Sequence, residues 1–379
     1  MIGQEVLHKD TLFNRTIESL KENKTLREAG KHITIPFGFP RLNKLHPGIS
    51  KGTINLISAN TKIGKSQITD ALYLYNPVNF VLTQNTNIKV KIFSFNLEMS
   101  KESKMRQVIA YRLYKKHQIR LAPRKLQSLY EDYILSDDIL RFIDEDREWF
   151  ESFENIVTFT DSVRNPTGIM KMMTDYARNN GKYYNKHNEI IPMDKILLND
   201  EEVNKTIDRY EQNDPDEYRI IITDHLGIMQ CEKNQGVTMN LYDTISKWSS
   251  DYCIRLRNRF GYIMANVQQQ AAGNEGVDAL KVDRQEPSAN NLSDNKSTAK
   301  DCDMLITLHS PFRAKQRAYM GYNIEKLKDN YRHLKIEFDR NGSGCETPLF
   351  FDGSVNFFSE LPLPEQMTPA LYDEITKRQ

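Results

Sequence analysis

The sequence predicts an α/β fold with a mostly parallel central sheet flanked by helices. Short apolar runs typical of buried strands recur along the chain and alternate with segments of helical periodicity. Gly-Lys-Ser at 64–66 directly follows the first of these runs, where the chain would pass from strand to helix. The 379 residues, of which 39% are hydrophobic, are enough to bury a large core.

The composition narrows the class of protein. A net charge of +1 excludes a globally basic surface, so any contact with nucleic acid must come from local patches. No apolar run approaches the ~20 residues that span a bilayer, and the amphipathic N-terminus does not resemble a signal peptide. The four cysteines lie far apart, without a CxxC pair, which predicts neither a zinc site nor a disulfide scaffold. These features predict a cytoplasmic protein without membrane association.

Residues 10–29 are predicted to form a helix that precedes the sheet. Its apolar residues recur at steps of three and four: Leu12, Phe13, Ile17, Leu20 and Leu26. Asp10 or Thr11 could cap its start, and Gly30 could end it. The apolar stripe is narrow, which leaves two interpretations open: a helix packed on its own domain, or a helix that docks on a neighbouring subunit.

The remaining elements follow in order after a loop-rich segment at 31–52. The predicted strands are Ile54–Ile57, Val90–Asn96, Ile156–Phe159, Tyr218–Thr223, Tyr262–Val267, Met304–Leu308 and Leu334–Phe338. The predicted helices are 65–75, 100–116, 166–178 and 240–260. Alternating strands and helices indicate parallel βαβ units.

Two segments interrupt this alternation. Residues 181–217 are polar and charged, which predicts a surface insertion, and residues 269–300 lack periodicity. A long loop inside a compact domain is usually functional or disordered. We therefore expect an N-terminal helical segment at 1–33, a main domain at 34–360 and a C-terminal tail at 361–379.

Residues 58–66, Ser-Ala-Asn-Thr-Lys-Ile-Gly-Lys-Ser, have the position and composition of a phosphate-binding loop. Backbone N–H groups of such a loop and the positive end of the next helix face the phosphates. Lys65 would reach the β- and γ-phosphates, and the Ser66 hydroxyl would ligate Mg²⁺. The predicted nucleotide-binding residues are Ala59, Asn60, Thr61, Lys62, Ile63, Gly64, Lys65 and Ser66. Ala59 stands where the pattern G-x-x-x-x-G-K-[ST] has its first glycine.

Two acidic residues follow predicted strands and are candidates for hydrolysis of a nucleotide. Asp224 ends the apolar strand 218–223 and is the candidate for holding Mg²⁺; a helix cap or a surface turn is the alternative. Glu98 follows the strand 90–96, at the sheet edge where open α/β folds bind ligands. It is the candidate for polarising the attacking water, and an ordinary exposed glutamate is the alternative.

Two further residues could contact phosphates. Gln268 ends the strand 262–267, where its amide could detect a γ-phosphate and report it to the following loop; a polar loop residue is the alternative. Arg340 lies between a strand and a Gly turn and could stabilise the transition state as an arginine finger; a solvated arginine is the alternative.

Together these segments resemble DnaB-type replicative helicases, the hexameric RecA-like superfamily 4, over roughly residues 34–358. The matching segments occur in the family's order and comprise Ser58–Ser66, Asn96-Leu97-Glu98-Met99, Ile222–Leu226, Ala265–Gln268, Asp301-Cys302-Asp303 and Arg340-Asn341-Gly342. The family's P-loops typically have Ala at the first position, as Ala59 is here. The resemblance implies a RecA-like P-loop ATPase that uses ATP and Mg²⁺.

The resemblance also implies individual roles. Glu98 would be the catalytic glutamate, Gln268 the γ-phosphate sensor, and Arg340 an arginine finger supplied to the neighbouring subunit. The helix at 10–29 would be the linker that docks on the next subunit and closes the ring.

Three departures from the family pattern stand out. The family often carries a Lys two residues before the arginine finger, where this chain has Phe338. The Arg of the family's Asp-Leu-Arg-Glu-Ser stretch is missing from Asn291–Asn295. We also expect an ATPase domain without the family's N-terminal collar domain and without a primase module, a compact form that suggests a phage or mobile-element origin and a host-cytoplasmic location.

The main functional hypothesis is an ATP-driven, ring-forming helicase that moves along single-stranded DNA at a fork, 5′ to 3′ by resemblance. Loops at 231–239 and 269–300 would bind DNA phosphates, with Lys233, Arg284, Lys296 and Lys300 as candidate contacts. The expected partners are further copies of the chain in a hexameric ring and a primase, loader or polymerase. A RecA-like strand-exchange ATPase and a degenerate ATPase that acts as a replication loader or scaffold are the alternatives.

Overall fold

The computed structural model describes residues 11–192, 206–234, 236–271 and 286–377. The strands of the central sheet are β1 (Ile54–Ala59), β2 (Lys89–Asn96), β3 (Val157–Thr160), β6 (Glu217–Asp224), β9 (Ile263–Gln269), β10 (Met304–His309), β13 (Tyr331–Asp339), β14 (Cys345–Asp352) and β15 (Phe357–Glu360). The main helices are α1 (Leu12–Glu28), α2 (Pro40–Leu45), α3 (Lys65–Asp70), α4 (Asn76–Thr83), α5 (Lys101–His117), α6 (Asp137–Glu145), α7 (Arg147–Ile156), α8 (Pro166–Asn179), α10 (Leu241–Ser246), α11 (Ile254–Phe260), α13 (Thr298–Asp301), α14 (Ile324–Leu327) and α15 (Pro369–Lys377).

In the described residues these strands form one nine-stranded sheet in the order β15-β14-β13-β10-β1-β9-β6-β2-β3. The strands from β10 to β3 pair in parallel, and β13, β14 and β15 add an antiparallel extension. The prediction of a mostly parallel sheet flanked by helices is therefore confirmed. The carboxyl ends of β1, β9, β6 and β2 meet at one edge, which is where the predicted site residues follow their strands.

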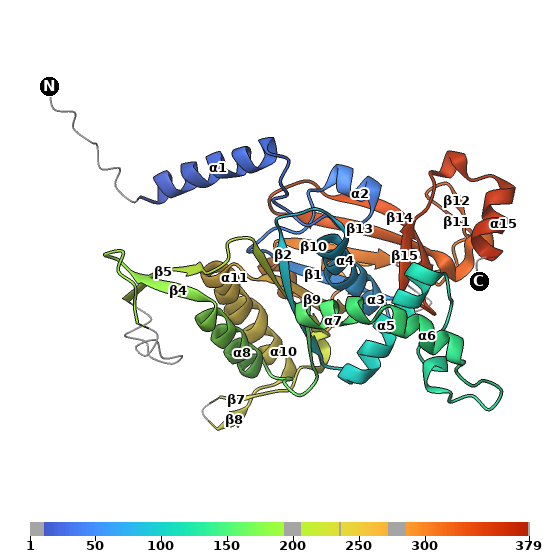
Figure 1. Cartoon of the computed structure of the whole chain (residues 1–379), viewed down its shortest axis with the longest axis horizontal. Helices are drawn as coiled ribbons and strands as arrows, with labels where there is room; N and C mark the ends of the chain where they lie inside the picture. Colours follow the sequence, from blue (N-terminus) through green and yellow to red (C-terminus); the bar gives the residue numbers. More distant parts are fainter. Residues whose placement is uncertain (1–10, 193–205, 235, 272–285, 378–379) are drawn as a thin grey trace.

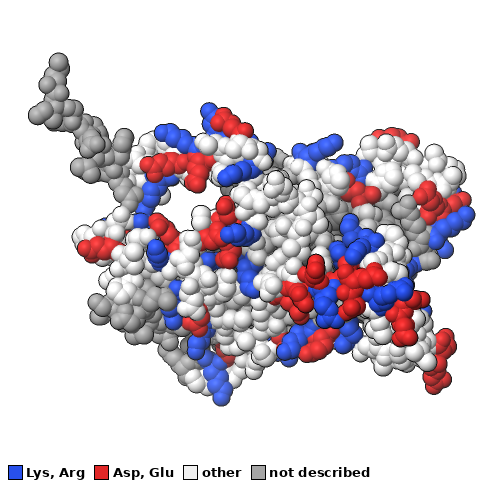
Figure 2. Space-filling model, in the orientation of Figure 1, with Lys and Arg blue, Asp and Glu red and all other residues white. Residues whose placement is uncertain are grey.

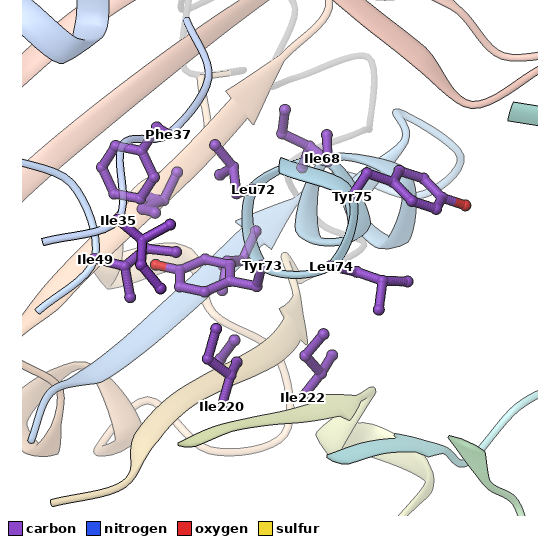
Figure 3. Packing of buried hydrophobic residues seen from close by; sticks show 14 of the residues in the cluster. Ile35, Phe37, Ile49, Ile68, Leu72, Tyr73, Leu74, Tyr75, Ile220 and Ile222 are labelled. Atoms are coloured by element: carbon purple, nitrogen blue, oxygen red, sulfur yellow. The ribbon is translucent and has the colours of Figure 1, made fainter. Parts of the chain in front are cut away.

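Helices cover both faces of the sheet because neighbouring strand residues point to opposite sides. On one face, Ile220 and Ile222 of β6 pack beneath the helix that follows the P-loop, together with residues such as Leu72 and Tyr73 (Figure 3). On the other face, Ile221 packs with Trp248 and with residues of α8 and α11. Both layers hold the carboxyl edge of the parallel strands in place (Figure 1).

Several elements extend or modify the prediction. The helix expected at 65–75 continues through a π-helical turn at Ala71–Tyr75 into α4, and the expected helix 240–260 contains a similar turn at Lys247–Cys253. The polar segment at 181–217 contains an antiparallel hairpin, β4 (Gly181–Asn185) with β5 (Ile207–Gln212), and its last residue begins β6. The segment at 361–379 contains α15, whose Tyr372 and Ile375 are buried against Tyr322 and Ile324.

Helix α1 lies at one side of the molecule, away from the sheet (Figure 1). Thr11 caps it by accepting a hydrogen bond from the backbone N–H of Asn14, as the sequence predicts. None of its residues is buried, and Leu12 and Phe13 are 75% and 71% exposed. This exposure favours the interpretation of α1 as a helix that docks on a neighbouring subunit, which stays a prediction.

Two general properties of the surface bear on function. None of the helices in the described ranges is long and apolar enough to cross a membrane. On the face seen in Figure 2, Lys and Arg residues alternate with Asp and Glu residues, in agreement with the near-zero net charge.

Candidate functional site

The phosphate-binding loop connects the buried strand β1 to α3. Gly64 has φ of 108°, a left-handed conformation that glycine adopts at little cost, and Lys62 has φ of 59°. A side chain at Gly64 would also meet Phe351 of β14 at 3.2 Å. This sharp turn places Lys65 and Ser66 in the first turn of α3, where the backbone N–H groups lack helical partners.

Asp224 and Glu98 lie at the carboxyl edge of two neighbouring strands, β6 and β2. Asp224 pairs with Asn96 in the sheet register, and the backbone N–H of Leu97 donates to the carbonyl oxygen of Asp224 at 2.9 Å. Glu98 is exposed just beyond this hydrogen bond, and Asp224 is 8% exposed. The two acidic residues thus differ in accessibility: one is buried beside the P-loop helix, the other faces solvent.

His225 shows that these residues form one cluster. Burial and the positive charge of Lys65 lower the pKa of His225, while Asp224, Glu98 and Asp294 act in the opposite direction. The lowered pKa means that His225 is neutral at pH 7. Sequence reasoning did not single out His225, although its position directly after Asp224 was the available signal.

The buried end of β6 carries an oxygen that suits a hydrated Mg²⁺. Asp224 Oδ1 is buried and has no hydrogen-bond partner among the described residues. Buried polar atoms are normally paired, so this oxygen is suited to accept from water bound to an ion. Ser66 and Asp224 therefore fit Mg²⁺. No group of three or more His, Cys, Asp or Glu residues in the described part of the chain forms a site for another metal.

Gln268 is buried and bonded away from the P-loop. Its Nε2 donates to the carbonyl oxygens of Ser293 (2.5 Å) and Asn295 (2.7 Å), and its Oε1 accepts from Thr298 Oγ1 at 2.6 Å. The next residue, Gln269, points to the opposite face and donates to Thr61 Oγ1 of the P-loop. Gln269 is thus a P-loop contact that the sequence interpretation missed.

Arg340 lies at the opposite edge of the sheet. Its Nη1 donates to Asp303 Oδ1 at 3.0 Å, and Asp303 caps the start of β1 by accepting from the Ile54 N–H at 2.8 Å. The P-loop follows the other end of β1, about 20 Å away for a six-residue strand. A single chain therefore brings Lys65, Ser66, Glu98 and Asp224 together and holds Arg340 away from them.

Comparison with known proteins identifies the fold but not a close relative. No protein-family profile and no curated protein sequence matches the chain. The ATPase domain of G40P is similar in structure, with a TM-score of 0.63 over 93% of this chain and 99% of that chain, at 14% sequence identity. A DnaB-like replicative helicase, described with its primase interactions, gives a TM-score of 0.60 over 91% of this chain and 66% of that chain, at 16% identity. This chain has the RecA-like fold of DnaB-type helicase ATPase domains. The fold expected from the motifs is confirmed.

The basic residues predicted to contact DNA are distributed over two parts of the RecA-like domain. Lys296 and Lys300 are exposed and line a pocket of about 390 Å³ with Tyr242, Leu292, Asp294 and Ser297. Lys233 is exposed on a short hairpin, β7 (Lys233–Asn234) with β8 (Val237–Thr238), where the sequence predicted only a loop. Arg284 lies outside the described residues.

A buried arginine supports the P-loop of this RecA-like domain and was missed at the sequence level. Arg332 of β13 is 1% exposed, and its Nε donates to the carbonyl oxygen of Ile63 at 2.6 Å. Its guanidinium also pairs with Asp329 at 3.2 Å and lies over the Phe351 ring. Burial lowers the pKa of Arg332 to about 10, which still leaves it charged at neutral pH.

We expect Arg332→Met to raise the Kd for ATP roughly tenfold, since it removes a charged donor worth ~1.5–3 kcal/mol from the loop backbone. Isothermal titration with ATP would measure this change. Arg313→Met is the matched control, because Arg313 pairs with the same Asp329 but lies on the surface. Equal Kd values for both variants would contradict the supporting role of Arg332.

Proposed function

We propose that the chain is an ATP-dependent, ring-forming DNA helicase that hydrolyses ATP at subunit interfaces and moves along single-stranded DNA. The observation that carries this proposal is that the candidate catalytic residues lie at two opposite edges of the sheet. Lys65, Ser66, Glu98 and Asp224 gather at one edge of the sheet, and Arg340 is presented at the other. A second copy, placed with its Arg340 edge against the P-loop edge of the first, would complete each site.

The residues have distinct tasks in this mechanism. Lys65 and the first-turn N–H groups of α3 bind the β- and γ-phosphates of ATP. Mg²⁺, held by Ser66 and through water by Asp224, would neutralise charge on the phosphate oxygens. Glu98 is accessible to solvent and orients the attacking water. Arg340 of the neighbouring subunit stabilises the charge that develops on the transferred phosphoryl group.

Assembly and DNA binding extend the same proposal. The apolar residues Leu12, Phe13 and Leu20 of α1 would dock on the next subunit of a hexamer, since they are exposed in the part of the chain that the structure describes. DNA would pass through the central channel of the ring, where its phosphates would contact Lys233, Lys296 and Lys300. A primase, a loader or a polymerase is the proposed partner; the DnaB-like helicase of similar fold is itself described with primase. We propose a cytoplasmic location, in the host cell if the chain is encoded by a phage.

A forked-duplex unwinding assay tests the proposal, with native mass spectrometry to count subunits in the presence of ATP and single-stranded DNA. We expect ATP-dependent strand separation by a hexamer, from a fork with a free 5′ tail. Open filaments with strand exchange would favour the recombinase alternative. DNA binding without ATP hydrolysis would favour a loader or scaffold.

Glu98→Gln should reduce the turnover rate of ATP about 10²-fold or more while leaving ATP affinity nearly unchanged, because the amide cannot accept a proton from water. A coupled ATPase assay at saturating ATP would measure it. Glu102→Gln is the control, since Glu102 is an exposed glutamate in the first turn of α5 with no assigned role. Full turnover by Glu98→Gln would reject the assignment of Glu98.

A further inference from the structure

The segment from Ser293 to Asp303 connects Gln268 to Arg340, which lies at the opposite edge of the sheet from the P-loop. Gln268 binds the beginning of this segment, at Ser293, Asn295 and Thr298. Arg340 binds its end: Nη2 donates to the carbonyl oxygens of Lys300 (3.2 Å) and Cys302 (3.3 Å), and Nη1 binds Asp303. Between them lies only the single turn of α13, about 6 Å long.

The start of this connection is buried and fully hydrogen-bonded. Gln268, Asn295 and Thr298 are each at most 2% exposed. The Nε2 group of an amide carries two hydrogens, and Gln268 already donates to two carbonyl oxygens. A hydrogen bond from Nε2 to a γ-phosphate must therefore replace one of these two bonds. Gln268 is also bonded to Thr298, the first residue of α13, so a movement of the Gln268 side chain would be transmitted to this short helix.

The end of the connection is anchored on one side and free to change on the other. Asp303 is bound by Arg257 at 2.9 Å and by the N–H of Ile54, so it stays fixed to the sheet. The Arg340 side chain is 51% exposed, and two of its three hydrogen-bond acceptors are backbone carbonyls at the end of α13. The segment 293–303 is thus hydrogen-bonded both to Arg340 and to Gln268, the proposed γ-phosphate sensor.

We propose that Thr298 and Asp303 are positioning residues that couple the Gln268 sensor to Arg340: contact of Gln268 with a γ-phosphate shifts α13 and releases Arg340 toward the neighbouring subunit. This inference rests on the proposed function. In this proposal, the nucleotide bound to a subunit determines whether the Arg340 of that same subunit can reach the neighbouring active site.

Coupling of this kind is reciprocal, so releasing Arg340 must favour the nucleotide that carries a γ-phosphate. Asp303→Asn removes the carboxylate that holds Arg340. It should raise the ratio of the Kd for ADP to the Kd for a non-hydrolysable ATP analogue roughly fivefold. In a Thr298→Val background, where the sensor has lost a bond to α13, the same substitution should change this ratio much less.

The experiment is this double-mutant cycle, measured by isothermal titration on the full chain with circular dichroism as the check of folding. Thr298→Ser should keep the coupling because it keeps the hydroxyl. Thr347→Val is the control, since Thr347 is as buried but lies on β14 with Glu360 as its partner. If Asp303→Asn does not fold, Arg340→Gln replaces it in the cycle.

The outcomes separate the two proposals. Non-additive effects of Thr298→Val and Asp303→Asn support the coupling, whereas a purely structural role would weaken both nucleotides equally. Additive effects, or an unchanged ratio, overturn the coupling but leave the helicase proposal intact. Failure of the unmodified chain to bind either nucleotide overturns both.

Discussion

Arg340→Ala should lower ATP turnover about 10³-fold or more, the effect of losing an arginine that stabilises a phosphoryl-transfer transition state. ATP affinity of the same subunit should change by about fivefold at most, through the proposed link to Gln268, because its own Arg340 lies at the opposite edge of the sheet from its P-loop. Steady-state ATPase measurements with single-stranded DNA would give the rate, and isothermal titration would give the affinity. Arg317→Ala is the matched control, since Arg317 is 88% exposed and pairs only loosely with Glu325 at 3.4 Å.

Mixing variants tests whether Arg340 acts on a neighbour. Arg340→Ala subunits keep Glu98, and Glu98→Gln subunits keep Arg340. In a mixed ring, both residues are intact at each interface where an Arg340→Ala subunit contributes its P-loop edge and a Glu98→Gln subunit contributes its Arg340 edge. Equimolar mixtures should therefore recover part of the activity that each variant lacks alone. Absence of any recovery, with mixed rings confirmed by native mass spectrometry, would show that Arg340 does not act across the interface.

Lys104→Met should lower the free energy of unfolding by about 3–5 kcal/mol, the cost of leaving a buried charge without its partner. Lys104 of α5 and Asp70 of α3 form an ion pair at 2.6 Å, with both side chains 2% exposed. The pair joins the helix after the P-loop to the helix after Glu98. Urea denaturation at pH 8, where Asp70 is ionised, would measure the change.

The pH dependence offers a control for this second prediction. Burial raises the pKa of Asp70 from 3.8 to about 6, although Lys104 acts in the opposite direction. A raised pKa in the folded state means that stability is lost as the pH rises from about 4 through about 6. Without Lys104, the loss of stability with rising pH is larger. The free energy of unfolding of the variant should therefore be closest to that of the unmodified chain at pH 4. The double variant Asp70→Asn, Lys104→Met should recover much of the stability at pH 8, and equal losses in both variants would contradict the argument.

The parallel part of the fold could be predicted from the sequence because its strands are buried on both faces. Such strands form continuous apolar runs, as in Ile220–Ile222, and most of them are followed by a helix. The antiparallel extension was less visible. Pro348 interrupts the pattern of β14, and β15 has only four residues. Helices α6 and α7 are strongly amphipathic, so their periodicity was an available signal that the sequence interpretation missed.

The site residues that follow strands could be predicted because chain order places them at the same edge. Glu98 follows β2 and Asp224 ends β6, and these strands are parallel neighbours, so both residues lie at the same edge of the sheet. Two features could not be predicted. Arg332 meets the P-loop across 269 residues of sequence, and nothing local marks it as buried. The bonds that hold Gln268 depend on the loop conformation at 293–298, which lacks any periodic pattern.

Strand β13 gives the proposed ring an unusual vulnerability. Its first residues support the P-loop of their own subunit through Arg332, and the chain just beyond its last residue, Asp339, supplies Arg340. In the proposed ring, nine residues of extended chain, about 30 Å, would therefore separate two different catalytic centres. A single lesion in this strand would damage the pocket of one subunit and the pocket of the next. In genetic terms, such alleles should act dominantly when co-expressed with the intact chain, since each defective copy impairs a healthy neighbour.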